Sequence, residues 1–128
     1  IMDREKFINP TKEQFKQLMA LDYKGPIMMI NLLKFKKEGG REAYAKYGEG
    51  LQESFENIGG QATKRGDALM TVIGDEEWNE VLVAEYPSID AFIEMQRDRK
   101  YQAAVPYRDE AIEDSRLIAV RADQQPVI

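Results

Sequence analysis

Two polar residues interrupt the apolar run IMMINLLKF at positions 27–35, and both have side chains that can do chemistry. The Asn31 amide must find hydrogen-bond partners if it is buried, and it can orient a substrate carbonyl or dioxygen. Lys34 can bind an anion or serve as a base. The structural alternatives are a hydrogen bond from Asn31 to a neighbouring strand, and a Lys34 side chain that reaches solvent or pairs with an acid.

Tyr101 and Arg108 form a second candidate pair, seven residues apart on one face of a predicted helix. Arg108 falls on an otherwise apolar stripe with Val105 and Ile112. An arginine that points inward needs a carboxylate, which comes either from the protein, with Glu85 as the first candidate, or from a ligand. Arg108 is therefore the strongest site signal in the sequence, and an internal ion pair is its alternative.

Aromatic side chains add groups that can hydrogen-bond or stack. Tyr44 and Tyr47 share the inner stripe of a predicted helix, where a phenol can bind a ligand or act as a general acid, or can simply fill the core. Trp78, the only tryptophan, can stack on an aromatic substrate or pack at a strand end or dimer edge. Arg65 is a further candidate that, like Arg108, can bind a carboxylate of the protein or of a ligand. The predicted substrate-binding residues are Asn31, Lys34, Tyr47, Trp78, Tyr101 and Arg108.

The sequence contains no cysteine and no histidine, and these two absences restrict the chemistry. They exclude disulfides, thiolate nucleophiles, Cys-ligated metals, Ser-His-Asp catalysis and His-ligated haem, iron or zinc. Sites for Mg²⁺ or Ca²⁺ made of carboxylates alone remain open, but no Asp/Glu spacing resembles a calcium loop. We therefore expect no metal and no cofactor, and the catalytic residues stay unassigned.

The charge pattern bears on partners and location. The chain has 128 residues and a net charge of −5 at pH 7, with basic residues scattered among acidic ones. This argues against binding to nucleic acid or to an anionic membrane surface. No apolar run approaches the roughly 18 residues of a membrane span, and residues 1–6 lack the apolar core of a signal peptide. We expect a cytoplasmic protein.

Apolar periodicity and turn residues divide the chain into helices and strands. Thr11 and Gln14 fit a capping box, and Ser88 is a favourable N-cap. The predicted elements, in chain order, are a helix from Thr11 to about Leu21, a strand over 27–35, a helix over 41–58, a strand over 61–74, a strand over 78–86, two helical pieces after Ser88 with the second over 99–113, and a strand over 116–122.

Glycines mark irregular points in these elements. Gly48 and Gly50 lie inside the helix over 41–58, so the helix bends there or another segment packs close to its backbone. Gly66 is expected to mark a bulge or bend in the strand over 61–74. A short turn after Gly74 predicts that this strand and the next one pair as a hairpin.

The central element order is βαββαβ, which predicts an α+β, ferredoxin-like fold with an antiparallel sheet and both helices on one face. The strands over 27–35 and 78–86 are apolar on both faces, so the face without helices also needs cover. A second copy is the simplest cover, and two facing sheets form a barrel in a homodimer. We predict a helical leader over 1–25, a dimeric α/β-barrel domain over 26–122 and a tail over 123–128.

Several segments together resemble a known family. They are INLLKF at 30–35, Tyr44, Tyr47, Gly59-Gly60, VAEYPS at 83–88, Tyr101-Gln102 and Arg108. The chain resembles, over about residues 26–121, the family called domain of unknown function 1330, of the dimeric α/β-barrel superfamily. The N-terminal helix and the long helix over 41–58 depart from its usual pattern. The resemblance implies the fold and the homodimer. Superfamily relatives include cofactor-free monooxygenases, muconolactone-isomerase-like enzymes and haem enzymes, which use a histidine that this chain lacks.

These observations leave two classes of function open. The first is a cofactor-free oxygenase or an isomerase that acts on a small anionic or enol-type substrate in a pocket between sheet and helices. Arg108 and Lys34 would anchor the substrate, while Asn31 and Tyr47 polarise a carbonyl or hold dioxygen. The second is a non-catalytic module for ligand binding or assembly. The expected partners are a second copy of the chain and a small molecule.

Overall fold

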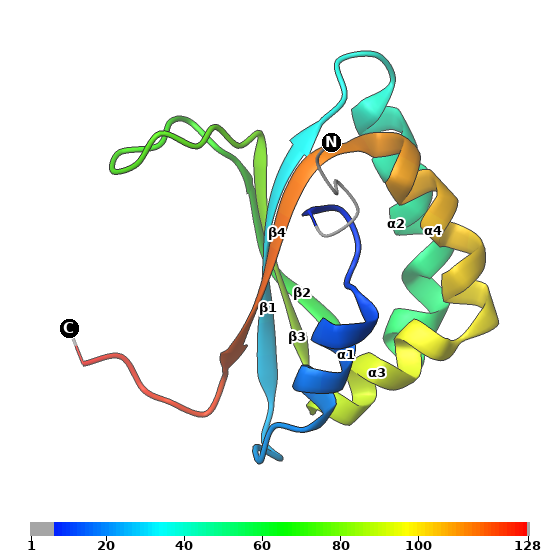
Figure 1. Cartoon of the computed structure of the whole chain (residues 1–128), viewed down its shortest axis with the longest axis vertical. Helices are drawn as coiled ribbons and strands as arrows, with labels where there is room; N and C mark the ends of the chain where they lie inside the picture. Colours follow the sequence, from blue (N-terminus) through cyan, green and yellow to red (C-terminus); the bar gives the residue numbers. More distant parts are fainter. Residues whose placement is uncertain (1–6, 128) are drawn as a thin grey trace.

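The computed structural model describes residues 7–127, in which a four-stranded antiparallel sheet carries four helices on one face (Figure 1). The elements in chain order are α1 (Lys12–Met19), β1 (Ile27–Phe35), α2 (Gly40–Asn57), β2 (Gln61–Asp67), β3 (Glu80–Tyr86), α3 (Ile89–Arg97), α4 (Arg99–Ala111) and β4 (Ile112–Arg121). The strand order is β2-β3-β1-β4. This is the ferredoxin-like α+β fold that the element order predicts.

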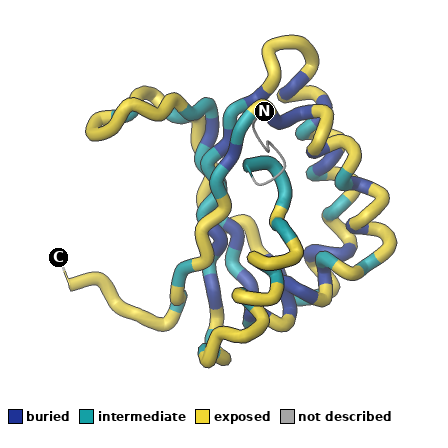
Figure 2. The backbone as a smooth tube through the Cα atoms, in the orientation of Figure 1, coloured by how far each residue is buried: buried dark blue, intermediate teal, exposed yellow. Residues whose placement is uncertain are grey.

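The central strand β1 runs antiparallel to both of its neighbours, and its residue Asn31 lies opposite Leu82 of β3 and Leu117 of β4. Side chains alternate along a strand, so the odd-numbered residues of β1 point toward the helices. Among them, Ile27 and Leu33 are 2% and 0% exposed. The buried residues accordingly lie between the sheet and the helical layer (Figure 2).

The opposite side of the sheet, which we call the outer face, carries none of the helices of residues 7–127 (Figure 1). Cross-strand register places seven apolar residues on it, namely Met28, Ile30, Leu32, Val81, Val83, Ile118 and Val120. All of them stay half-buried or exposed in the single chain. The expectation that β1 and β3 are apolar on both faces is therefore confirmed.

Helix boundaries follow the capping residues. Thr11 Oγ1 accepts a hydrogen bond from the Gln14 backbone N–H at 3.1 Å, and Gln14 Oε1 accepts from the Thr11 N–H at 3.1 Å. This reciprocal pair is the predicted capping box of α1. Ser88 Oγ caps α3 by accepting from the Ala91 N–H at 3.1 Å. These local signals are satisfied within a few residues, which is why the sequence alone predicts them.

Helices α2 and α4 approach closely at one glycine. A β-carbon added at Gly50 would lie 2.8 Å from the Ala104 β-carbon, closer than real side chains pack. A β-carbon at Gly48 would meet nothing within 4 Å. Of the two alternatives for this helix, the close approach of another segment is therefore confirmed at Gly50.

The segment between β2 and β3 differs from the prediction. Apolar alternation predicted a strand that continues to Gly74, but β2 ends at Asp67, and no residue from there to Glu80 belongs to a strand. Alternation supports a strand only where a neighbouring strand pairs with it. Leu69 and Ile73 have no such neighbour and are 97% and 92% exposed. β2 and β3 still pair as predicted, but a long arm and not a short turn connects them.

The irregular point of β2 also differs from the prediction, because its register shifts between Ala62 and Lys64 and not at Gly66. Two strands begin at other residues than predicted: β3 begins at Glu80 and not at Trp78, and β4 begins at Ile112 and not at Arg116. The last difference arises because Ile112 already pairs with Phe35 of β1. Helix α4 consequently ends at Ala111. Within residues 7–127, no helix combines the length and apolar character that crossing a bilayer requires.

Candidate functional site

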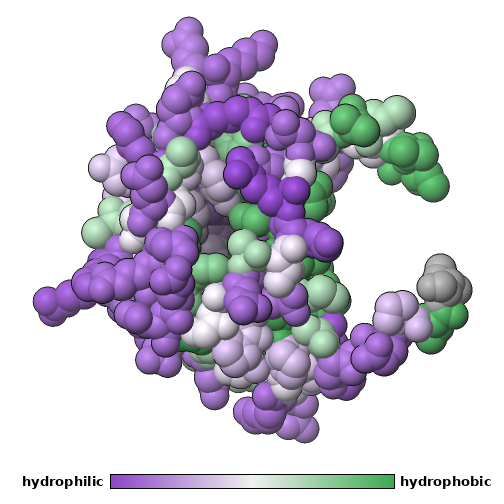
Figure 3. All heavy atoms as spheres, turned by 180° about the vertical axis from the view of Figure 1, so that it is seen from behind, coloured by the Kyte–Doolittle hydropathy of each residue, from purple (hydrophilic) through white to green (hydrophobic). Residues whose placement is uncertain are grey.

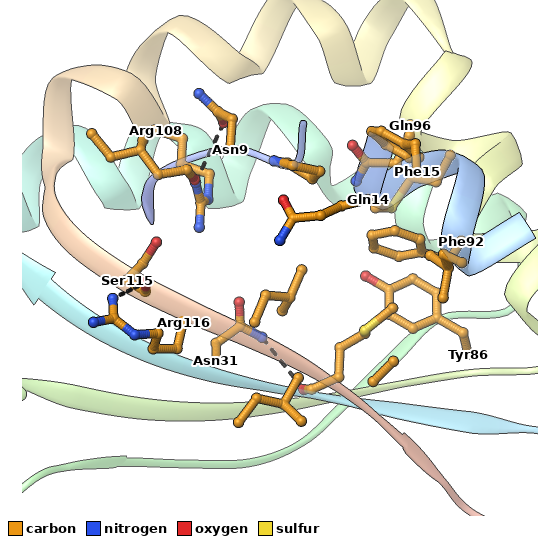
Figure 4. A pocket seen from close by; sticks show the side chains of 18 of the residues that line it. Asn9, Gln14, Phe15, Asn31, Tyr86, Phe92, Gln96, Arg108, Ser115 and Arg116 are labelled. Atoms are coloured by element: carbon orange, nitrogen blue, oxygen red, sulfur yellow. Dashed lines mark hydrogen bonds between the residues drawn. The ribbon is translucent and has the colours of Figure 1, made fainter. Parts of the chain in front are cut away.

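A cavity of about 330 Å³ lies on the helix-bearing side of the sheet (Figure 4). It is bounded by residues of β1, β3 and β4, of the helices α1 to α4, and of the segment that precedes α1. The polar residues that line it include Asn9, Gln14, Asn31, Tyr47, Gln96, Tyr101, Arg108 and Ser115. Four of the six predicted binding residues are therefore brought together here, and no acidic residue or lysine is among the described residues of the lining.

Arg108 places a charged guanidinium in the wall of this cavity, which Arg116 also lines. Only 7% of the residue is exposed. Its Nη1 donates to the Ile8 carbonyl and, at 3.5 Å, to Asn9 Oδ1. Within residues 7–127 no carboxylate forms an ion pair with it. The expected partner Glu85 lies on the outer face opposite Met28, so that pairing is wrong. A buried guanidinium without a carboxylate partner has the chemistry to bind an anion.

The Tyr47 and Tyr101 hydroxyls, from α2 and α4, lie 2.9 Å apart in the same wall. One phenol donates to the other, so the pair keeps one hydroxyl proton that can be donated to a ligand. Burial raises the pKa of Tyr47 well above its usual value, and the neighbouring Tyr101 adds to this effect, while Arg108 opposes it. Tyr47 consequently stays protonated near neutral pH, so its phenol serves as a hydrogen-bond donor and not as a base.

Asn31 forms the floor of the cavity in the middle of β1 (Figure 4). Its Nδ2 donates to the Leu82 carbonyl at 3.3 Å and to the Met29 carbonyl at 3.4 Å. These bonds orient the amide, as the structural alternative proposed. The Asn31 Oδ1 atom accepts no hydrogen bond among the residues that the structure describes. It is therefore able to accept a hydrogen bond from a ligand.

The segment before α1 closes the cavity over β4, and sequence reasoning missed it. Ser115 Oγ donates to the Phe7 carbonyl at 2.6 Å, and Arg108 holds the next carbonyl. The Arg116 guanidinium lies 4.9 Å from the centre of the Phe7 ring. These contacts join residues about a hundred positions apart, so they leave no local pattern in the sequence. The one usable signal was Ser115, a small polar residue on the helix-facing side of β4.

The structure separates Lys34 and Trp78 from the other four predicted residues. Lys34 is an even-numbered residue of β1, lies on the outer face and pairs with Glu113 at 3.4 Å. Trp78 precedes β3, and the Arg116 guanidinium lies 5.2 Å from the centre of its ring. Neither residue lines a cavity described here. Their expected place in the pocket is therefore corrected.

A second cavity, of about 440 Å³, lies between α2 and strands β2 and β3 and shares Asn31 and Tyr47 with the first. Its polar end contains Glu80, which is 2% exposed. Arg65 Nε lies 3.2 Å and Arg41 Nη1 3.6 Å from the Glu80 carboxylate oxygens. Arg65 thus has a carboxylate partner, which Arg108 lacks among residues 7–127. Burial raises the pKa of the adjoining Tyr44 to about 12.

Metal ligation has no support in the described residues. Between residues 7 and 127, no group of three or more acidic, histidine or cysteine side chains is arranged to hold a metal ion. The polar groups in the wall of the first cavity include the guanidinium groups of Arg108 and Arg116, the Tyr47–Tyr101 phenol pair and the amides.

Comparison with known proteins identifies the family. The family model of domain of unknown function 1330 matches residues 30–122. The chain belongs to this family. The crystal structure of the RPA0582 protein from Rhodopseudomonas palustris, described as a protein of unknown function, superposes with a TM-score of 0.85 at 43% identity, and the match covers 93% of this chain and 98% of that one. No curated protein matches the sequence.

More distant structures share the fold of this member of the domain of unknown function 1330 family. A dimeric ferredoxin-like protein from Bacteroides fragilis is 18% identical with a TM-score of 0.53, covering 77% of this chain and 99% of that one. SnoaB, a cofactor-independent oxygenase from Streptomyces nogalater, is 13% identical with a TM-score of 0.54, covering 81% and 99%. At these identities the likeness concerns the fold.

Proposed function

We propose that this protein binds a small anionic or enol-type organic molecule in the cavity beside Arg108 and oxygenates it without a cofactor. The observation that carries the proposal is the buried Arg108 guanidinium, which no carboxylate of residues 7–127 neutralises. A carboxylate, enolate or phenolate of a ligand would supply the missing charge. The apolar part of the wall, including Phe15 and Phe92, suits an aromatic or alicyclic body.

The lining favours oxygenation over isomerisation. Isomerisation by proton transfer requires a base, and the described lining contains no acidic residue or lysine. Burial keeps Tyr47 protonated. An oxygenation that starts from an already ionised ligand needs no such base, because the ligand itself supplies the electrons. The cofactor-independent oxygenase SnoaB, which shares the fold, is consistent with this chemistry.

The reaction balances without an outside reductant. The enolate of a CH₂ group next to a carbonyl adds dioxygen and forms a carbon–oxygen bond, and the peroxide is then protonated. Loss of water then leaves a ketone: the oxygen–oxygen bond breaks, and the departing hydroxide takes the remaining C–H proton. In sum, CH₂ and O₂ become C=O and H₂O. Arg108 would hold the enolate, and the Tyr47–Tyr101 pair would donate a hydrogen bond to the developing peroxide.

The test measures binding and oxygen uptake with a panel of quinols, lactones and enol acids. Arg108→Ala should weaken binding of an active compound by about 10- to 100-fold, the worth of a charged hydrogen bond. Arg99→Ala, on the exposed side of the same helix, is the matched control and should change neither quantity. Unchanged turnover in Arg108→Ala would contradict the assignment. Binding without oxygen uptake would favour the non-catalytic alternative.

We also propose that the working unit is a homodimer that packs through its outer face. Support comes from the apolar residues of that face, among them Ile30, Val83 and Ile118, which residues 7–127 leave half-buried or exposed. Further support comes from the Bacteroides fragilis protein of the same fold, described as dimeric. Sedimentation equilibrium tests this directly, since a stable folded monomer at high concentration contradicts it.

A further inference from the structure

An arm projects from the sheet between β2 and β3, and it displays large apolar side chains to solvent (Figure 1). This arm, residues 68–79, carries Leu69, Met70, Val72 and Ile73, which are 97%, 73%, 83% and 92% exposed. Single exposed apolar residues are ordinary on protein surfaces, but four within five positions indicate an interaction site.

The arm is held in place at its base. Ala68 donates to the Asn79 carbonyl at 2.9 Å, and Asn79 donates to the Leu33 carbonyl of β1 at 2.8 Å. Glu76 lies 3.6 Å from the Arg116 guanidinium, which also stacks on Trp78. These contacts position the arm on the outer face while its apolar residues stay uncovered. The arrangement favours a preformed binding element.

The C-terminal tail projects from the same side of the molecule. Ala122 donates to the Pro26 carbonyl at 3.0 Å, and the chain then leaves the sheet toward Val127, which is 95% exposed. The arm and the tail together bracket the outer face, with the helices on the far side (Figure 1). Seen from behind, the arm displays apolar surface, and an open recess separates it from the tail (Figure 3).

We infer that the arm is a clasp that closes on the flank of a second copy of this chain. The inference rests on the proposed homodimer and adds a second contact to it. The arm extends beyond the outer face, so any molecule seated on that face lies alongside the arm. Under two-fold symmetry, each copy covers the outer face of the other and receives the other's arm. A second copy of the chain thereby buries both the apolar outer face and the apolar residues of the arm.

Sedimentation equilibrium of the full chain with arm variants tests the clasp. The double variant Leu69→Asp/Ile73→Asp should raise the dimer dissociation constant by about 30-fold or more, as loss of central apolar contacts does. Leu21→Asp is the matched control, because Leu21 is also an exposed leucine, at 51%, but lies outside the arm between α1 and β1. The substituted side chains are solvent-exposed in the single chain, so folding should be unaffected, as circular dichroism would verify.

The outcomes separate the clasp from the homodimer. A wild-type monomer overturns both. A wild-type dimer whose dissociation constant the double variant leaves unchanged overturns the clasp alone and keeps the sheet-to-sheet homodimer.

Single cysteines give an independent readout, since the chain has none of its own. Ile73→Cys labelled with a photo-activatable maleimide should cross-link to a second copy. Glu94→Cys, exposed on α3 in the helical layer, should not. Absence of intermolecular cross-links from position 73 in a dimeric sample would also overturn the clasp.

Discussion

The hydroxyl groups of Tyr47 and Tyr101 lie 2.9 Å apart, although 54 positions separate the two residues in the sequence. Each residue is more than nine-tenths buried, and their rings meet edge to face with centroids 6.0 Å apart. The pair joins α2 to α4 at the point where the first cavity begins. A bond between buried hydroxyls that also faces a cavity contributes to stability and offers a donor to a ligand.

A double-mutant cycle should reveal this bond. Tyr47→Phe and Tyr101→Phe should each lower the free energy of unfolding by about 0.5–1.5 kcal/mol, because each removes the same hydrogen bond. The double variant should cost less than the sum of the single variants. Urea unfolding measures all three. Tyr107→Phe, at a residue that is 40% exposed, should be close to neutral. Strict additivity would contradict a shared bond.

Alkaline pH should destabilise the fold through its buried phenols. Burial raises the folded-state pKa of Tyr44 to about 12, and it raises the pKa of Tyr47 and Tyr86 as well. Below pH of about 10 these phenols are protonated in both states and stability does not depend on them. Above it, the unfolded chain releases protons that the folded chain still holds, so the free energy of unfolding falls as pH rises through the folded pKa.

Tyrosinate absorbance and urea unfolding, measured across pH 9–12, test this dependence. Tyr44→Phe should make the stability loss shallower, because one of the groups that titrates is removed. A stability that stays flat over the range would show that the buried phenols do not couple to folding.

Replacement of Arg108 should separate binding from stability. Arg108→Met removes a buried cation that has no carboxylate partner among the described residues and keeps a side chain of similar length. The free energy of unfolding should therefore stay within about 1 kcal/mol of wild type or rise, while ligand binding weakens. Thermal unfolding with and without ligand measures both effects. A loss of several kcal/mol without ligand would instead make the contact with the Ile8 carbonyl the main role of Arg108.

The two glycines inside α2 should respond to alanine in opposite directions. Gly48→Ala should stabilise by about 0.5–1 kcal/mol, since a β-carbon there meets nothing within 4 Å and alanine favours the helix. Gly50→Ala should destabilise by about 1–3 kcal/mol, because the new methyl group pushes α2 away from Ala104 of α4. Chemical denaturation of the pair provides the comparison, and equal effects would contradict the close helix approach.

Local patterns in the sequence predicted most of the fold and four residues of the candidate site. Caps, apolar runs and helical stripes act within a few positions, so Thr11, Ser88 and the strand over 27–35 were found where predicted. The same periodicity put Tyr101 and Arg108 on one inward face of α4. Strand alternation also predicts the position of Lys34, since a residue three positions from Asn31 on a strand points to the opposite face of the sheet.

Tertiary structure alone decided how distant segments meet. The alternation of Leu69 to Ile73 is the same in a paired strand and in a free arm, and only the absence of a pairing neighbour in the described sheet distinguishes them. The closure of the cavity by Phe7 and Ile8 depends on partners on α4 and β4 about a hundred positions away. The sequence by itself determined most of the elements and the inward stripes of the helices, because these follow from short-range sterics and periodicity. The cavity, the burial of Arg108 within it and the projecting arm come from long-range packing, which the order of residues along the chain does not encode locally.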